Sequence, residues 1–263
     1  MERPEIAVEN YKEVYNYYRQ FEQPARVLKL VYAAFNGILH PRVNLADGAQ
    51  DDLDLIKRET VPHFYIFNHL SRFDYFIFAS TLHQIAPDDI GTIRTMGADF
   101  NFRWPQHRQL KEGRTLQMGA GPITDFTGGI PVFRSMEYPD VDLRPVQEEL
   151  FNCIRDGLAT GQKAAAAPEG KINYDNPATL LRFRSGVAEV IHRTTELLDR
   201  EAGITPIGFC YKRDLAVRRN KGKNASVHIG RTLFVPPGME VPTITERART
   251  DLQHAVTTAH ELY

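Results

Sequence analysis

The sequence predicts an α/β fold: a largely parallel or mixed central sheet flanked by helices, with a helical pair at the N-terminus. Short apolar runs of strand length, such as residues 64–67 and 204–211, alternate with longer segments of helical periodicity through most of the chain. Hydrophobic residues make up 42% and charged residues 25% of the 263 residues, which is ordinary for a globular protein with a substantial core.

The first 45 residues contain two segments with helical spacing. Aromatic residues and a valine recur every three or four positions from Tyr11 to Phe21, which predicts one apolar helical face. A second apolar stripe follows Pro24 and runs from Val27 to Leu39. We expect residues 1–45 to form a helical pair packed on an α/β domain of residues 46–263. The alternative for aromatic helices with basic flanks is a position in a membrane interface.

The remaining elements are predicted from periodicity and turn residues. Residues 44–54 are acidic and contain glycine, so we expect a solvated loop there. Residues 97–127 are rich in glycine and proline and are expected to form a long excursion over the sheet, a kind of loop that is often functional. Strands are predicted at residues 64–67, 89–96, 163–167, 204–211 and 225–235, with a short one between the glycine pair at 128–129 and Arg134; helices are predicted at 75–82, 143–158, 185–200 and 243–262.

A polar elbow between the strand at 64–67 and the next helix carries His69 and Asp74. Ser71 and Asp74 also fit the pattern in which a serine caps a helix and an acid three residues later reaches back to it. With Ser71 as the cap, the chain can bend the imidazole toward the carboxylate. His69 would then be a general base that takes a proton from a hydroxyl, and Asp74 would fix its tautomer. The alternative is a capped helix beside a solvent-facing histidine.

The charge balance and the cysteine content narrow the classes of function that the chain can have. Lys plus Arg (32) nearly balances Asp plus Glu (33), which argues against a nucleic-acid partner. Cys153 and Cys210 form no paired metal-ligand spacing and no disulfide framework, so we expect no metal and favour a reducing compartment. No signal core and no apolar run of about eighteen residues is visible. We therefore expect a cytoplasmic protein, free in solution or peripheral on the cytoplasmic membrane face.

Four short blocks follow one another along the chain: residues 68–74 (NHLSRFD), 129–134 (GIPVFR), 168–170 (PEG) and 204–208 (ITPIG). Their sequences, order and intervals resemble the motif blocks of the glycerolipid acyltransferases, the family that includes 1-acylglycerol-3-phosphate acyltransferase. The step at residues 183–186 (FRSG) resembles a segment that follows the third block in that family. The similarity covers roughly residues 64–235.

The resemblance implies transfer of an acyl group from a thioester, carried by coenzyme A or acyl carrier protein, to a hydroxyl of a lyso-lipid or glycerol phosphate. No cofactor beyond this acyl donor is implied. His69 would be the base and Asp74 its orienting partner. Arg134, with the turn at Glu169 and Gly170, would line the acceptor site. The family usually continues the third block with Thr-Arg, where this chain has Lys171 and Ile172, so Lys171 offers a point charge without a bidentate fork.

Two further features leave alternatives open. Residues 211–223 carry six Lys or Arg against one Asp; this basic segment is either a solvated loop or a contact for an anionic membrane surface or acyl carrier protein. The altered third block also leaves two other functions: a catalytically inactive lipid- or membrane-binding scaffold of the same fold, and an acyl-thioester hydrolase that uses water as the acceptor.

Overall fold

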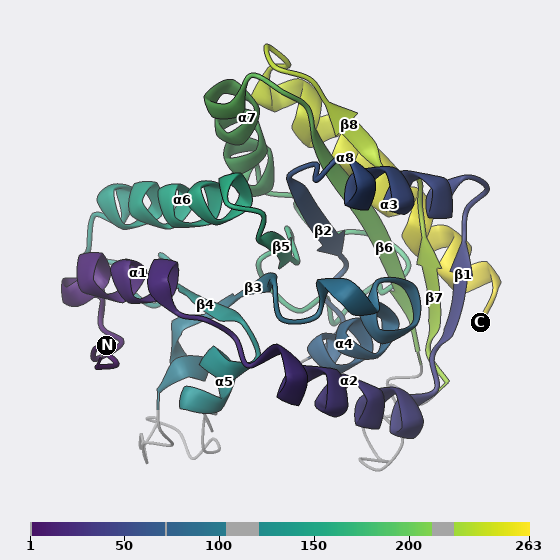
Figure 1. Ribbon diagram of the computed structural model, residues 1–263, viewed down its shortest axis with the longest axis horizontal. Coiled ribbons are helices and arrows are strands. Elements are labelled where there is room, and N and C mark those ends of the chain that lie inside the picture. The colour runs from purple at the N-terminus through teal and green to yellow at the C-terminus, as the bar shows by residue number, and fades with distance from the viewer. Residues whose placement is uncertain (1, 72, 104–120, 212–223) are drawn as a thin grey trace.

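The computed structural model describes residues 2–71, 73–103, 121–211 and 224–263. One central sheet is covered by helices, which confirms the predicted α/β class (Figure 1). Its strands, in chain order, are β1 (Arg42–Leu45), β2 (His63–Phe67), β3 (Ile93–Ala98), β4 (Gly129–Val132), β5 (Lys163–Ala166), β6 (Ala202–Cys210), β7 (Ser226–Ile229) and β8 (Leu233–Val235).

The sheet is mixed and mostly parallel. Its spatial order is β1-β7-β6-β2-β5-β3-β4, and β8 pairs with β6 outside this path. Only β7 and β8 run antiparallel to their neighbour β6; the other pairings in the described chain are parallel. Strand β2 lies between β5 and β6, so the chain that leaves the end of β2 emerges at the middle of the sheet.

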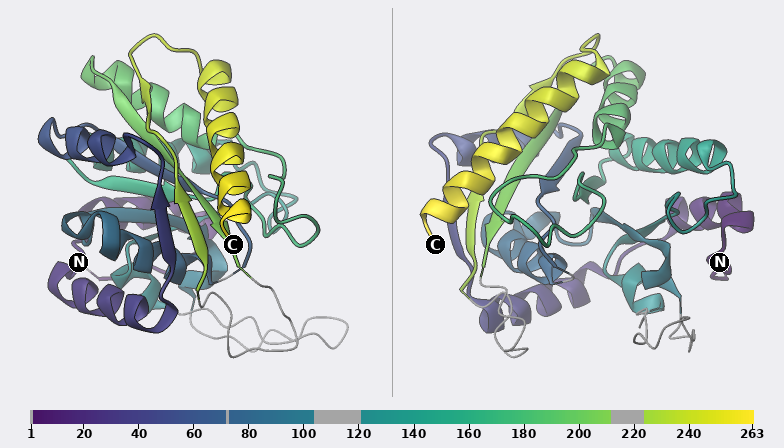
Figure 2. Two further views of the ribbon diagram at one scale, coloured as in Figure 1. Left: turned by 90° about the vertical axis from the view of Figure 1, so that its right-hand side faces the viewer. Right: turned by 180° about the vertical axis from the view of Figure 1, so that it is seen from behind.

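Helices cover both faces of the sheet (Figures 1 and 2). They are α1 (Tyr11–Gln20), α2 (Ala25–Leu39), α3 (Ala49–Arg58), α4 (Asp74–Ile85), α5 (Pro122–Phe126), α6 (Arg144–Ala159), α7 (Gly186–Leu198) and α8 (Val241–Glu261). Short 3-10 helices form at Val8–Asn10, Pro87–Asp89 and Asp99–Phe102. The predicted helices at 75–82, 143–158, 185–200 and 243–262 therefore correspond to α4, α6, α7 and α8.

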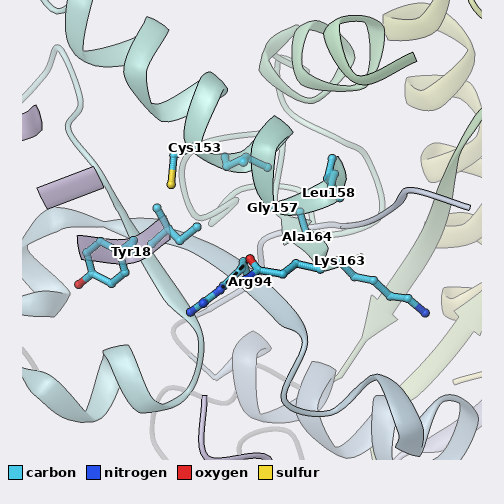
Figure 3. A pocket seen from close by; sticks show the side chains of 10 residues that line it. Tyr18, Arg94, Cys153, Gly157, Leu158, Lys163 and Ala164 are labelled. Carbon is cyan, nitrogen blue, oxygen red and sulfur yellow. Dashed lines mark hydrogen bonds between the residues drawn. The ribbon is translucent and has the colours of Figure 1, made fainter. Parts of the chain in front are cut away.

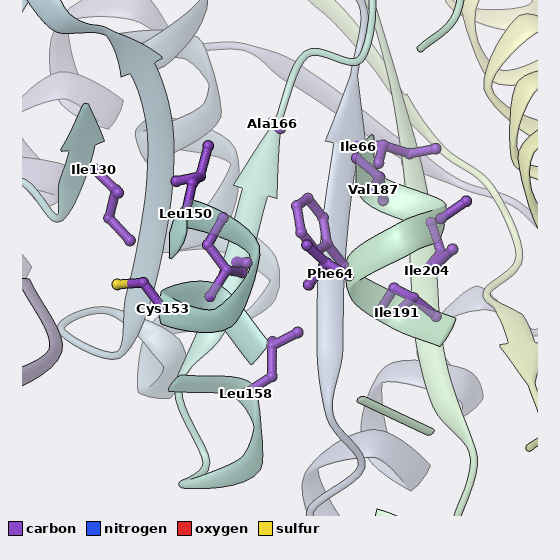
Figure 4. Close-up of a cluster of buried hydrophobic side chains, with 14 of the residues drawn as sticks. Phe64, Ile66, Ile130, Leu150, Cys153, Leu158, Ala166, Val187, Ile191 and Ile204 are labelled. Atoms are coloured by element: carbon purple, nitrogen blue, oxygen red, sulfur yellow. The ribbon is translucent and has the colours of Figure 1, made fainter. Parts of the chain in front are cut away.

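Two hydrophobic clusters sit on opposite faces of β2, and the alternation of its side chains explains why all five of its residues are buried. Phe64 and Ile66 join the cluster formed with α1, α6, α7 and α8, which Figure 4 shows beside α6 and α7. Tyr65 and Phe67 join the cluster formed with α2, α3 and α4. The alanines Ala164 and Ala165 of β5 divide between the same two clusters.

The two N-terminal helices are present, but they pack on different parts of the body. Helix α1 packs on α6, and its aromatic stripe is buried: Tyr15 and Tyr18 are at most 1% exposed. Helix α2 packs on α4 through Leu28 and Tyr32. The aromatic stripe of α1 is therefore core, and it is not available to a membrane surface.

Two sequence-based assignments are wrong. Residues 44–54 are not a solvated loop: β1 ends at Leu45 and α3 begins at Ala49. The acidic composition misled because Asp52 is only 5% exposed and forms an ion pair with Arg231, far along the chain. The expected single strand at 225–235 is two strands, β7 and β8, interrupted at residues 230–232.

Candidate active site

The candidate site lies at the carboxyl ends of three adjacent parallel strands, β6, β2 and β5. His69 follows β2, the turn at Glu169 follows β5, and Tyr211 follows β6. Because parallel strands end at the same edge of a sheet, segments 100 or more residues apart in sequence meet here.

Asn68 fixes the point at which the chain leaves the sheet. Its side-chain nitrogen donates to the carbonyl of Phe209 at 3.0 Å, and its side-chain oxygen accepts from the N–H of Phe209 at 2.7 Å. The buried amide thus imitates one more backbone pair of the β2–β6 ladder. This places the next residue, His69, just beyond the last strand position.

His69 and Asp74 are in direct contact. The distance from Nδ1 of His69 to Oδ2 of Asp74 is 2.7 Å. The same Oδ2 accepts from the N–H groups of Leu70 and Ser71, at 2.7 and 2.9 Å. The elbow therefore wraps around one carboxylate, which holds the ring and the backbone of the turn together.

The cap is arranged differently from the predicted one. Asp74 does reach back to the N–H of Ser71, but the helix begins at Asp74 itself, with Phe73 at the N-cap. The hydroxyl of Ser71 instead accepts from the N–H of Phe73 at 2.9 Å. Ser71 is thus part of a tight turn ahead of α4 and is not its cap. The carboxylate of Asp74 binds the N–H groups of Leu70 and Ser71 in this turn.

Tyr211 completes the environment of Asp74. Its hydroxyl donates to Oδ1 of Asp74 and lies 2.7 Å from the hydroxyl oxygen of Ser71. Asp74 is 1% exposed, yet both of its oxygens have donors, as a buried carboxylate requires. Tyr211 was not predicted; its place directly after a strand parallel to β2 was the signal that could have found it.

Glu169 holds the backbone of His69. Its carboxylate accepts from the N–H of His69 at 2.7 Å and from the N–H of Leu181 at 2.8 Å. The carbonyl of His69 accepts from the N–H of Asn173 at 2.7 Å, a second contact that the sequence did not reveal. Burial raises the pKa of Glu169, and the two backbone N–H donors oppose that rise. Glu169 is 2% exposed, so its contacts are those of a positioning residue.

The imidazole of His69 has one nitrogen fixed and one accessible. Its side chain is 28% exposed, and no hydrogen bond from the described part of the chain reaches Nε2. A base needs this combination, because the carboxylate sets the tautomer while Nε2 meets the proton that it removes.

Arg134 and Lys171 both follow strands on the β5 side of β2. Arg134 follows β4, which lies three strand spacings from β2. The strand spacing alone puts the Cα atoms of these two strands roughly 14 Å apart. Its guanidinium is ion-paired with Glu137 and lies 5.5 Å from the ring centroid of Phe100. Lys171 is exposed and has no ion pair among the residues that the structure describes. Among the described residues, no hydrogen bond or ion pair joins Arg134 to His69 or to Lys171.

Neither cysteine offers a nucleophile at this site. Cys153 lies in the core beside a cavity of about 10 Å³, the size of one water, which Tyr18, Arg94 and Gly157 also line (Figure 3). Burial raises the pKa of Cys153 to about 12 and that of Cys210 to about 11. Thiolates are the reactive form, so both side chains are inert near neutral pH.

Comparison with known proteins adds no identification. No protein-family model matches the chain, and no curated protein matches it in sequence. Within residues 2–71, 73–103, 121–211 and 224–263, no group of three or more His, Cys, Asp or Glu side chains could hold a metal ion. None of the described helices is both long and apolar enough to cross a bilayer. The basic segment, beyond Tyr211, lies outside the described residues.

Proposed function

We propose that this protein is an O-acyltransferase that moves an acyl chain from an acyl thioester to a hydroxyl of a lyso-lipid or glycerol-phosphate-like acceptor. The observation that carries the proposal is the His69–Asp74 pair, with Nδ1 bound 2.7 Å from the carboxylate and Nε2 accessible. The order of the four sequence blocks, which resemble those of the glycerolipid acyltransferases, supports the same reaction.

The reaction then needs only this chain and its two substrates. Nε2 of His69 takes the proton of the acceptor hydroxyl as its oxygen attacks the thioester carbonyl, and Asp74 stabilises the imidazolium that forms. The tetrahedral intermediate collapses, the C–S bond breaks, and the proton passes from Nε2 to the leaving thiolate. The products are an oxygen ester and a free thiol, and no covalent acyl-enzyme is needed.

For the acceptor, Arg134 is the proposed cationic contact and Lys171 a secondary one. Arg134 follows β4 on the β5 side of β2, and Glu137 holds its guanidinium in place. An arginine at this edge of the sheet suits an anionic head group. Glu169 and Gly170 form the turn between Arg134 and the base, and their part is to shape this wall of the acceptor site.

One assay separates transfer from its two alternatives. Purified protein is mixed with acyl-CoA or acyl-acyl carrier protein, with and without a panel of lyso-lipids, while thiol release and acylated product are followed. Release that depends on the acceptor supports the transferase. Release without an acceptor, with free fatty acid as product, would make the protein a thioester hydrolase. Absence of release with every donor and acceptor, together with lipid binding, would make it a scaffold.

The proposed location is cytoplasmic, with peripheral contact to a membrane through the outward side of α2. Val27, Leu30 and Ile38 on this helix are 56%, 74% and 65% exposed, and α2 contains no acidic residue. The opposite side of α2 reaches the His69 turn through ring contacts from Phe35 to Phe76 and from Phe76 to Phe73. An acceptor with a long acyl tail would therefore leave the bilayer close to the base.

This location is tested by sedimentation with vesicles of phosphatidylcholine and phosphatidylglycerol. Leu30→Ser with Ile38→Ser should weaken binding, whereas Leu197→Ser is the matched control, because Leu197 is 56% exposed on α7. Deletion of the N-terminal helices is unsuitable, since α1 belongs to the core. Failure of the wild-type protein to sediment with anionic vesicles at low salt would contradict membrane contact and favour a water-soluble acceptor.

A further inference from the structure

An exposed arginine lies over the turn that holds the base. In this turn Gly170 has a φ of +68°, and a side-chain carbon added there would stand 2.9 Å from Nε of Arg184. The N–H of Arg184 donates to the carbonyl of Pro168 at 3.0 Å, which ties the residues ahead of α7 to the same turn. Glu169, between these two anchor points, binds the N–H of His69. Arg184 therefore binds the backbone of the same turn whose glutamate binds His69, the proposed base.

The guanidinium of Arg184 differs from that of Arg134 in one respect. Arg134 is ion-paired with Glu137, whereas Arg184 is exposed and has no ion pair within the residues that the structure describes. Lys171, directly after Gly170, is likewise exposed and unpaired in the described chain. Two cations without an ion pair among the described residues therefore flank the Glu169–Gly170 turn, on the wall of the site where the sequence has Ile172 instead of an arginine.

We propose that Arg184 binds a phosphate group of the substrate and supplies, from just ahead of α7, the bidentate contact that Ile172 cannot make. Arginine presents two parallel N–H donors to a phosphate, and Lys171 beside it adds a point charge. Gly170 favours this arrangement, because its φ of +68° suits glycine and a side chain there would have to shift the guanidinium of Arg184. The inference rests on the proposed acyl transfer and names the residue that selects its phosphate-bearing substrate.

The phosphate has two chemical sources, and the substrates used in the test distinguish them. Acceptors are a lysophospholipid with a phosphomonoester and a monoacylglycerol of the same chain. Acyl donors are an acyl-CoA and an acyl-pantetheine, which has the thioester without any phosphate. Arg184→Ala and Arg184→Lys are compared with wild type in all four combinations. Arg182→Ala is the matched control. Arg182 is also exposed, and its substitution removes the same charge two residues away.

If the inference holds, Arg184→Ala lowers kcat/KM by roughly 10- to 150-fold for the phosphate-bearing substrate only, the loss expected for one charged hydrogen bond. Arg184→Lys should recover part of it, and Arg182→Ala should change it little. Loss confined to the phosphate acceptor identifies the acceptor head group, and loss confined to acyl-CoA identifies the donor.

Equal loss with all four combinations, or an equal effect of Arg182→Ala, would overturn the role of Arg184 and leave the transfer reaction intact. Because Arg184 is exposed, we expect the variants to fold, and circular dichroism checks this. Absence of transfer by the wild-type protein with every combination is a different result: it would refute the proposed function and, with it, this inference.

Discussion

The two ends of strand β2 each carry a histidine, and their environments are opposite. His63, at the first position, is 0% exposed, and its Nε2 lies 2.7 Å from the hydroxyl of Thr205. His69, just past the last position, has its Nδ1 on Asp74 and its Nε2 accessible. Burial, together with the charge of Lys163, lowers the pKa of His63 well below its ordinary value. It is therefore a neutral core residue at the pH where a base must work.

The difference teaches which contacts make a histidine a base. Near His63 a carboxylate, Asp89, is also present, but it binds Lys163 and the hydroxyl of Tyr65 instead of the imidazole. At the other end, Asp74, Glu169 and Asn173 all act on His69, one on its ring and two on its backbone. Acidic neighbours occur at both ends of the strand, and only the carboxyl end directs them at the histidine.

The largest expected effect is that of His69→Ala. Removal of the general base should lower kcat by about 10²- to 10⁴-fold. The acyl-donor KM and the thermal unfolding midpoint should stay near wild type, because the side chain is partly exposed and contributes little to the core. Steady-state kinetics on folded protein check this. More than a tenth of wild-type kcat would remove His69 from the mechanism and erase the contrast with His63.

Asp74→Asn comes next. The amide oxygen can still face Nδ1 of His69, but the charge that stabilises the imidazolium is gone, so we expect kcat to fall about 10- to 150-fold. The amide nitrogen would face the hydroxyl of Tyr211, which can accept a hydrogen bond in place of donating one. A crystal structure or a near-UV spectrum tests whether the turn is kept. Unchanged kcat in an intact turn would show that Asp74 is only structural.

Glu169→Gln should have a smaller effect on turnover and a distinct pH signature. A glutamine has one acceptor oxygen for the N–H groups of His69 and Leu181, so one N–H loses its partner, at a cost of about 1–3 kcal/mol. Because the folded pKa of Glu169 is raised, its contribution to stability is present below the ordinary pKa and is lost as pH rises through the raised value.

The advantage of wild type over Glu169→Gln should therefore shrink as pH is increased from acid to neutral. Urea unfolding at a series of pH values measures this difference in unfolding free energy. The value of kcat at neutral pH reports whether the imidazole of His69 has moved from its working position. A pH-independent difference in unfolding free energy would mean that the native pKa is not raised.

The smallest effect on turnover is expected for His63→Gln. Loss of the buried ring should destabilise the protein by about 2–4 kcal/mol, as for other large-to-small core changes, while kcat of the folded variant stays near wild type. The pKa of His63 is lowered, so the unfolded chain binds its proton first, and wild type loses stability relative to the variant as pH falls through the ordinary value for histidine. A catalytic loss as large as that of His69→Ala would contradict the division between the two ends.

The sequence predicted the layers of this fold well because strand and helix periods are local. It failed around Asp52. The acidic composition there is typical of a loop, but Asp52 is ion-paired with Arg231, 179 positions away in the sequence. The pair of His69 and Asp74 was also readable, since both residues lie in one turn. The contacts of Asn173 and Leu181 were not, because nothing in their own segments indicates that they meet His69 and Glu169. Tyr211 follows a predicted strand, but the sequence does not give the strand order that brings it to Asp74.

The four sequence blocks also divide between chemistry and packing. The first contains His69, the proposed base, and its carboxylate partner Asp74, and the third contains the glutamate that holds the backbone of His69. The fourth has a different role. Gly208 lets α8 lie directly on β6, since a side-chain carbon there would stand 2.1 Å from the carbonyl oxygen of Ala255, and Thr205 bonds His63 at the far end of β2. A motif can therefore mark a close approach of backbones and no reacting group at all.

The amide of Asn68 has a consequence for when the proposed site forms during folding. It closes on Phe209, 141 positions later, and Tyr211 closes on Asp74 across 137 positions. Such distant pairs form late, because a long loop must be ordered before they add any stability. On the proposed mechanism, turnover during refolding should therefore lag behind the helical signal, and a nascent chain should stay inactive until the ribosome has released residue 211.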